Sequence, residues 1–78
     1  MATSPLGRNV RAAREQRGWS RATLAGKSGV SEPTIARLEL YGHEPRVKNL
    51  RALSRALGVE LTDLMRPPVR RPREPEAS

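Results

Sequence analysis

The sequence predicts an all-α fold, a compact bundle of five short helices, and three observations support this prediction. Apolar side chains recur at intervals of three and four residues in five separate segments, as they do on the inner face of a helix. Serine begins and glycine ends several of these segments. The connections between the segments are short, so the helices must pack directly against one another.

The first helix is expected over residues 5–17. Ser4 followed by Pro5 is typical of a helix N-terminus, because serine caps free N–H groups and proline needs none. Gly18 ends the run. The inner positions follow at helical spacing: Leu6, Val10 and Ala13.

The second and third helices are expected over residues 21–28 and 32–40. Ser20 and Ser31 are the predicted N-caps, and Gly29 allows a sharp turn between the two helices. Two short helices joined in this way form a helix-turn-helix if their facing sides are apolar. The inner residues are indeed apolar: Leu24, Ala25, Val30, Ile35 and Leu38. Trp19, which precedes this motif, is expected to cover the core rather than to stack on a base.

A loop is expected over residues 41–46, followed by a fourth helix over 47–57 that Gly58 ends. A short fifth helix is expected over 61–65. Residues 67–78 hold four prolines and few apolar side chains, which predicts a disordered tail. The chain therefore divides into one domain, residues 1–66, and a Pro/Arg-rich tail.

The charge of the chain indicates a polyanionic partner. Lys and Arg number 15 against 8 Asp and Glu, a formal net charge of +7. Nucleic acid and an anionic membrane surface both attract such a protein. The basic residues are spread over several helices and no helix joins a basic face to a broad aromatic one, which disfavours the membrane. One Trp, one Tyr and no Phe cannot form a stacking platform for single strands, so duplex DNA is the expected partner.

Other function classes find little support in the composition. The chain has no Cys and one His, His43, so we expect neither a metal site nor catalytic residues nor a cofactor. No membrane span or signal peptide is visible in the sequence, and we expect a cytoplasmic protein associated with the nucleoid.

The whole pattern of residues 6–65 resembles the phage-repressor and Cro type of helix-turn-helix domain, also called the xenobiotic-response-element family. No single element is specific, and the combination at family spacing carries the resemblance. Its parts are Gly18-x-Ser20, Leu24-Ala25, Gly29-Val30-Ser31, Ile35-x-x-Leu38-Glu39 and Ala56-Leu57-Gly58-Val59. The resemblance implies a lambda-repressor-like bundle that binds double-stranded DNA.

The resemblance also implies which residues contact the DNA backbone. In the family, the second helix begins with a polar residue that binds a phosphate, and here that position is Arg21 behind the Ser20 cap, so both Ser20 and Arg21 are expected to bind phosphate. Thr34 either binds a phosphate or bonds within its own helix. Three further residues lie where relatives contact the backbone: His43, Arg46 and Lys48. Arg46 and Lys48 are favoured as contacts, and solvation is an equal alternative for His43.

Relatives read bases with the N-terminal half of the third helix. Because Ile35 and Leu38 must point inward, helical periodicity places four residues on the opposite face: Glu32, Pro33, Ala36 and Arg37. Arg37 matches the two guanine acceptors in the major groove, although a phosphate contact is nearly as well favoured. Glu32 either accepts from a cytosine amino group or interacts with the helix dipole.

Two charged positions of the family pattern are structural. Arg14 and Glu39 match the places where relatives form a partly buried ion pair, so we assign them to the fold rather than to DNA. One position departs from the family. Tyr41 replaces the usual glycine and Gly42 follows, which predicts that the third helix ends one residue later than in relatives.

These expectations combine into one function and one alternative. The function is a sequence-specific DNA-binding transcriptional regulator, expected to be a repressor that acts as a homodimer on a palindromic site. Any dimer would have to use the end of the fourth helix and the fifth, where Leu61, Leu64 and Met65 are expected to be partly exposed. The alternative is an antitoxin-type module whose tail binds a protein partner.

Overall fold

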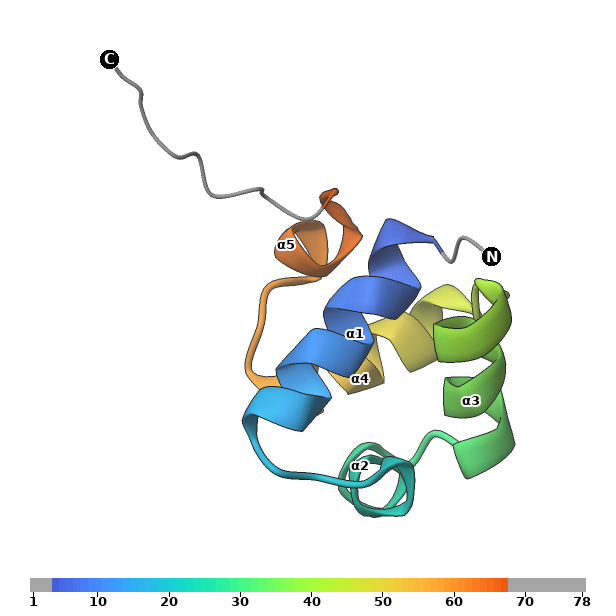
Figure 1. Ribbon diagram of the computed structural model, residues 1–78, viewed down its shortest axis with the longest axis vertical. Helices are drawn as coiled ribbons and strands as arrows, with labels where there is room; N and C mark the ends of the chain where they lie inside the picture. The colour runs from blue at the N-terminus through green and yellow to red at the C-terminus, as the bar shows by residue number, and fades with distance from the viewer. Residues whose placement is uncertain (1–3, 68–78) are drawn as a thin grey trace.

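The computed structural model describes residues 4–67, which form five helices around one core (Figure 1). The helices are α1 (Pro5–Gln16), α2 (Arg21–Ser28), α3 (Glu32–Tyr41), α4 (Val47–Leu57) and α5 (Leu61–Met65). The predicted all-α bundle is confirmed. The predicted tail covers residues 67–78, and residues 68–78 lie outside the described part of the chain.

The first three helices begin at the predicted serines. The Ser4, Ser20 and Ser31 hydroxyls accept hydrogen bonds from the backbone N–H groups of Gly7, Thr23 and Thr34. Each cap satisfies a donor that the helix itself cannot. At the other end of α2, Gly29 is left-handed with φ of 81°, which allows the chain to turn directly into α3.

Two helix ends differ from the predicted boundaries by one residue. α1 ends at Gln16, and Arg17 is its C-cap rather than its last residue. α3 ends at Tyr41, and its C-cap, Gly42, adopts φ of 74°. A helix ends readily where a glycine can adopt the left-handed conformation. Gly42 therefore sets the end of α3, one residue beyond the predicted span.

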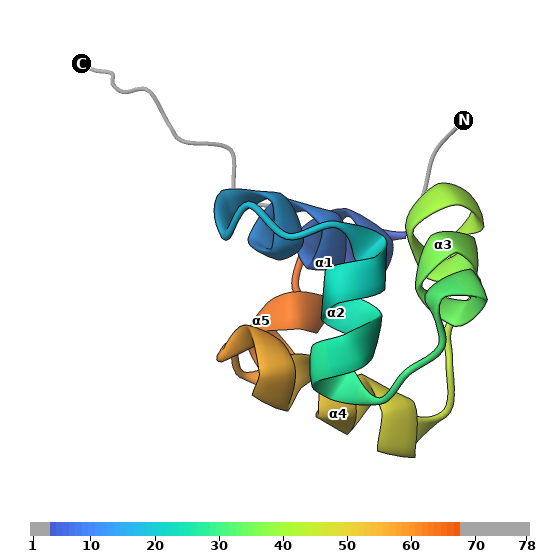
Figure 2. The same cartoon turned by 90° about the horizontal axis from the view of Figure 1, so that it is seen from below.

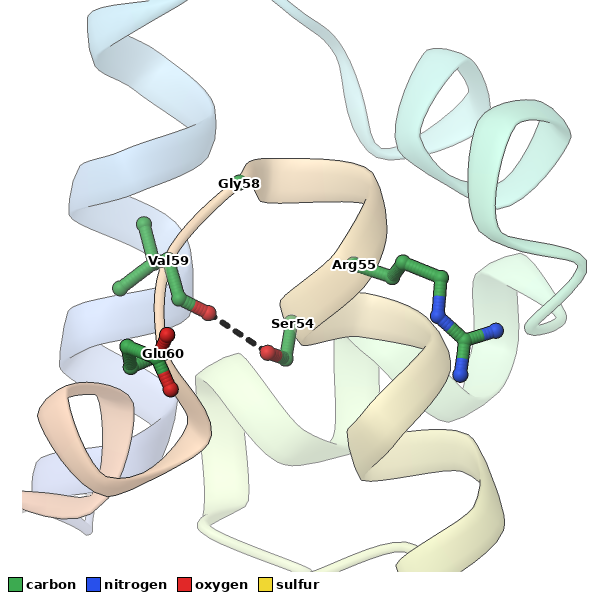
Figure 3. Close-up of a pocket in the computed structure, with 5 residues that line it drawn as sticks. All are labelled: Ser54, Arg55, Gly58, Val59 and Glu60. Atoms are coloured by element: carbon green, nitrogen blue, oxygen red, sulfur yellow. Dashed lines mark hydrogen bonds between the residues drawn. The ribbon is translucent and has the colours of Figure 1, made fainter.

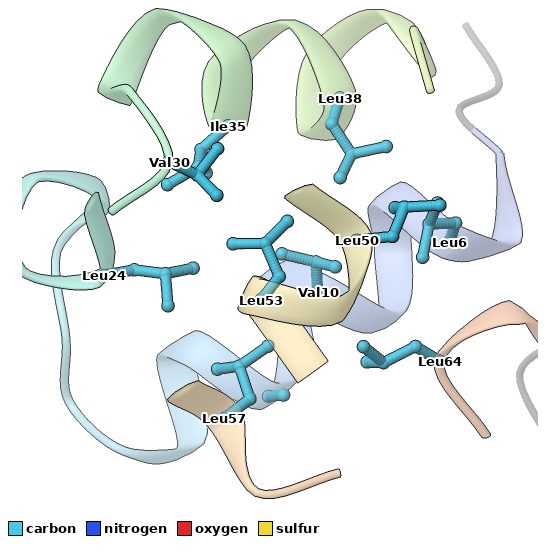
Figure 4. Close-up of a cluster of buried hydrophobic side chains, with 11 residues drawn as sticks. Leu6, Val10, Leu24, Val30, Ile35, Leu38, Leu50, Leu53, Leu57 and Leu64 are labelled. Atoms are coloured by element: carbon cyan, nitrogen blue, oxygen red, sulfur yellow. The ribbon is translucent and has the colours of Figure 1, made fainter. Parts of the chain in front are cut away.

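The core lies between all five helices (Figure 4). α1 packs against α3 and α5, while α2 packs against α3 and α4 (Figures 1 and 2). The buried apolar residues are Leu6, Val10, Ala13, Leu24, Val30, Ile35, Leu38, Leu50, Leu53, Leu57 and Leu64. Trp19 is partly buried and packs against this cluster, as predicted for a residue that covers the core.

α1 and α3 approach each other closely at Gly7, a residue that the sequence pattern did not single out. Gly7 is buried where α1 crosses α3. A Cβ atom at this position would overlap the backbone carbonyl of Leu38. The absence of a side chain therefore allows α1 to approach the backbone of α3, the helix that carries the predicted base-reading residues.

Side chains of α1 and of its C-cap residue, Arg17, also hold the C-terminal helices. The Asn9 Nδ2 donates hydrogen bonds to the carbonyls of Leu64 and Arg66, each at 2.6 Å. The Arg17 guanidinium donates to the carbonyl of Leu57. These carbonyls lie at helix ends, where they have no intrahelical partner. Asn9 thereby caps the C-terminal end of α5, and Arg17 caps that of α4.

The connection from α4 to α5 is a tight turn (Figure 3). Gly58 is left-handed with φ of 71°, and the Ser54 Oγ donates to the carbonyl of Val59 at 2.6 Å. A shallow depression beside this turn is lined by Ser54, Arg55, Gly58, Val59 and Glu60.

Candidate nucleic-acid interface

The two sides of α3 differ in the way that the sequence predicts. Ile35 and Leu38 are completely buried. On the opposite side Glu32, Pro33 and Arg37 are exposed, and Ala36 is partly buried. α3 lies at the edge of the bundle (Figure 2). Its apolar side therefore anchors the helix, while the predicted base-reading side is turned away from the core.

The N-termini of α2 and α3 are built alike. In each, the capping serine hydroxyl also bonds to a threonine hydroxyl three residues later, at 2.9 Å for Ser20 with Thr23 and 2.8 Å for Ser31 with Thr34. Thr34 thus bonds to its N-cap residue, and a phosphate contact by Thr34 stays a prediction. The caps remain on the surface, next to the positive end of each helix dipole. The start of α2 has no acidic residue in its first turn and is thus electrostatically suited to an anion, whereas α3 carries Glu32 there.

Arg14 and Glu39 form the buried ion pair that the resemblance implies. The Arg14 Nε and Nη2 donate to the two carboxylate oxygens of Glu39, both at 2.8 Å. The Arg14 Nη1 also donates to the carbonyl of Trp19 at 2.9 Å. The hydrogen bonds from Arg14 to Glu39 raise the pKa of the Arg14 guanidinium above its ordinary value. This bidentate pair connects α1 with α3.

Arg21 joins the same carboxylate, a contact that the sequence analysis missed. Its Nε donates to Glu39 Oε1 at 3.1 Å, and its side chain is 30% exposed. The helical pattern placed Arg21 at the start of α2 without showing that α3 brings Glu39 beside it. Arg21 is therefore both attached to the core and accessible from solvent.

The connection from α3 to α4 carries the remaining predicted backbone contacts. His43, Arg46 and Lys48 are all exposed. The rings of Tyr41 and His43 lie 6.0 Å apart. Arg46 is the N-cap of α4 but makes no side-chain cap, so the first N–H groups of that helix have no side-chain acceptor at the cap. Two exposed cations, Arg46 and Lys48, flank this open helix end.

The predicted contact residues thus lie on α3 and on the two segments that adjoin it, the start of α2 and the connection to α4. The start of α2 lies beside α3, as the bond from Arg21 to Glu39 shows, and the connection from α3 to α4 runs next to α3 (Figure 2). Contact of these residues with DNA stays a prediction.

The described residues show neither of two alternative kinds of site. Within residues 4–67 no group of three or more His, Asp or Glu side chains lies close enough together to hold a metal ion. No helix in this part of the chain is both long and apolar enough to span a bilayer.

Comparison with known proteins identifies the fold. A helix-turn-helix family model matches residues 10–64. Over 60 residues the chain is 40% identical to the HTH-type transcriptional regulator SlrR of Bacillus subtilis (strain 168). That alignment covers 76% of this chain but only 40% of SlrR, so the chain spans less than half the length of this relative.

Two solved structures are similar in backbone as well. The restriction-modification controller protein C.AhdI from Aeromonas hydrophila is 28% identical with a TM-score of 0.71, covering 77% of this chain and 91% of that one. The N-terminal DNA binding domain of SinR from Bacillus subtilis is 26% identical with a TM-score of 0.74, covering 78% and 90%. The chain belongs to the helix-turn-helix family, and within it to the Cro/C1 type.

Proposed function

We propose that this protein is a sequence-specific, double-stranded DNA-binding transcriptional regulator, and that it acts as a repressor by occupying its operator. The two-sided character of α3 carries the proposal, because the helix is anchored by Ile35 and Leu38 while Glu32, Pro33 and Arg37 remain exposed. The family membership and the DNA-binding names of its relatives support the same function.

Affinity would come mainly from phosphate contacts, which position a protein on DNA without reading its sequence. The candidates surround α3: Arg21 at the start of α2, and Arg46 and Lys48 at the start of α4. Backbone N–H groups at these helix ends add donors. The formal charge of +7 would accelerate encounter with the duplex and make binding strongly dependent on salt.

Specificity would come from α3 in the major groove. The forked guanidinium of Arg37 can donate to both guanine acceptors, and Glu32 can accept from a cytosine amino group. Pro33 and Ala36 offer apolar contact to a thymine methyl. These few side chains can read only a short half-site.

A homodimer on a palindrome would double that half-site, with centres roughly 34 Å apart. The structure changes which residues are available for the dimer contact. Leu64 was predicted to be partly exposed, but it is only 1% exposed because α5 turns it into the core. Met65 is 45% exposed and Leu61 is partly buried, so these two remain as candidates for a dimer contact.

Selection of bound fragments from random duplex DNA, at two salt concentrations, tests the proposed function. A regulator should enrich one short motif, present as an inverted repeat if the protein dimerises. Retention of duplexes without enrichment of any motif would show only non-specific binding by a basic surface. Failure to retain any duplex at low salt would contradict the proposal.

Truncation after Arg66 separates regulator from antitoxin-type module. The proposed function needs only the helical domain, so operator binding should persist without residues 67–78. If operator binding persists and a specific protein partner is lost on truncation, the tail serves a second function in protein binding.

A further inference from the structure

Glu39 contacts two arginines that come from different helices. Arg14 of α1 occupies both carboxylate oxygens, and Arg21 of α2 adds a third hydrogen bond through its Nε. The Glu39 side chain is wholly buried, while that of Arg21 is 30% exposed. A pair between Arg14 and Glu39 would be complete without Arg21. The third contact therefore needs its own explanation.

We infer that Glu39 positions the Arg21 guanidinium for a DNA phosphate, in addition to pairing with Arg14. The inference rests on the proposed function and adds Glu39 to the residues that serve DNA binding. Glu39 does not contact DNA itself, because it is buried. It is a positioning residue that acts through Arg21.

The charges of the cluster favour an anion as the next ligand. Two guanidinium groups share one buried carboxylate, which leaves a formal excess of one positive charge. The other nearby carboxylate, Glu15, lies 4.0 Å from the Arg14 Nη2 and is 54% exposed, so solvent screens it. Arg21 is also the first residue of α2, where the helix dipole is positive. A phosphate at this point would balance the excess charge.

The hydrogen bonds of Arg21 leave donors for that phosphate. Only its Nε is engaged, and within residues 4–67 neither of its Nη atoms makes a hydrogen bond. Arginine can bond a carboxylate through one donor and a phosphate through others, because its five donors form a planar fork. Attachment to Glu39 fixes the side chain before binding, which reduces the entropy lost when a phosphate arrives.

Lysine at position 21 tests this positioning role. R21K keeps the positive charge but loses the fork that can hold Glu39 and a phosphate together. R21Q removes the charge. The matched control is R11Q, because Arg11 also donates its Nε to a carboxylate, Glu15, at 3.0 Å but on the exposed side of α1.

The experiment measures Kd and its salt dependence on a duplex selected by the wild-type full chain. R21Q should weaken binding about tenfold, as expected for a lost charged hydrogen bond, and lower the salt slope by about 0.9. R21K should bind more nearly like R21Q than like wild type. R11Q should stay within about twofold of wild type, since exposed pairs away from the duplex contribute little. R21K binding equal to wild type would overturn the positioning role.

E39Q provides a second, independent test, at a temperature where circular dichroism shows the variants folded. It should weaken duplex binding in the wild-type background and add nothing in the R21Q background, because Glu39 acts through Arg21. An equal loss in both backgrounds would assign Glu39 to stability alone. If E39Q does not fold, the comparison of R21K with R21Q decides.

The outcomes distinguish this inference from the proposed function. A wild-type protein that ignores duplex DNA contradicts the proposed function itself. A wild-type protein that binds a selected site, with R21Q binding unchanged, contradicts only the role of Arg21 and Glu39.

Discussion

The helices α1–α3 and the helices α4 and α5 are stabilised at their ends in different ways. Each of the first three begins at a serine whose side chain caps it. α4 begins at Arg46 and α5 at Glu60, and neither residue makes a side-chain cap. At their C-terminal ends these two helices receive long-range hydrogen bonds instead, from Arg17, the C-cap of α1, to the carbonyl of Leu57 and from Asn9 of α1 to the carbonyl of Leu64.

This difference separates local from long-range specification. A serine cap acts within its own helix, so α2 and α3 carry much of the information for their boundaries in their own sequence. α5 has only five residues, too few to be stable alone, and depends on Asn9 and on the burial of Leu64. The helix proposed to read DNA thus belongs to the locally specified half of the domain.

The largest expected effect on stability tests whether the serine caps alone stabilise helices α1–α3. Arg14→Ala should lower the free energy of unfolding by about 3–5 kcal/mol, because it leaves the Glu39 carboxylate buried with only Arg21 beside it. Urea denaturation followed by circular dichroism measures the loss. A loss below about 1 kcal/mol would be typical of an exposed pair and would contradict the buried role.

A smaller and more local effect is expected in the other half. Asn9→Ala should cost about 1–2 kcal/mol, since it leaves the carbonyls of Leu64 and Arg66 without their side-chain donor. Hydrogen exchange should accelerate in α5 and stay unchanged in α2 and α3. Gln16→Ala, at an exposed position of the same helix, is the control. Uniform acceleration throughout the domain would show that α5 does not open on its own.

Exchanging the capping residues sharpens the comparison directly. Ser31→Ala should destabilise the domain by about 1 kcal/mol, whereas Arg46→Ser should stabilise it by a similar amount by giving α4 the cap that it lacks. Thermal unfolding measures both. Arg46→Ser should also reduce the salt slope of duplex binding by about 0.9 if Arg46 contacts a phosphate. No gain in stability would mean that Arg46 already stabilises the start of α4 in another way.

The smallest effect concerns acid stability. The hydrogen bond from Arg11 lowers the pKa of the Glu15 carboxyl below its ordinary value of 4.5. A lowered pKa in the folded state stabilises the protein above pH 4.5, and this contribution disappears as the pH falls through the folded-state pKa. Glu15→Gln should therefore have a slightly lower free energy of unfolding than wild type at neutral pH, and this difference should disappear in acid. A difference in the free energy of unfolding that grows as the pH falls would contradict a lowered pKa of Glu15.

Local patterns predicted much of the fold because the signals lie within a few residues of what they determine. The serine caps and the turn at Gly29 follow from residue type and position, and so does the inward direction of Ile35 and Leu38. The resemblance to the family added the pair of Arg14 with Glu39.

Contacts between distant residues were not predictable in the same way. Arg21 reaches Glu39, and Asn9 reaches Leu64, only after the helices pack. Leu64 was expected to be partly exposed because a short helix gives too little periodicity to fix which side faces the core. Gly7 and Gly26 both lie within helices, yet only Gly7 packs against another backbone, so residue type alone could not show the close approach. The DNA contacts themselves remain predictions.

The most direct test of the account compares Arg37→Ala with wild type on a selected duplex and on an unrelated one. If the exposed side of α3 reads bases, the substitution should cost about 1–3 kcal/mol on the selected duplex, relax the preference at one base pair and leave unrelated binding nearly unchanged. Equal losses on both duplexes would make Arg37 a phosphate contact and contradict base reading by this residue. Unchanged binding to both would place the interface elsewhere on the molecule.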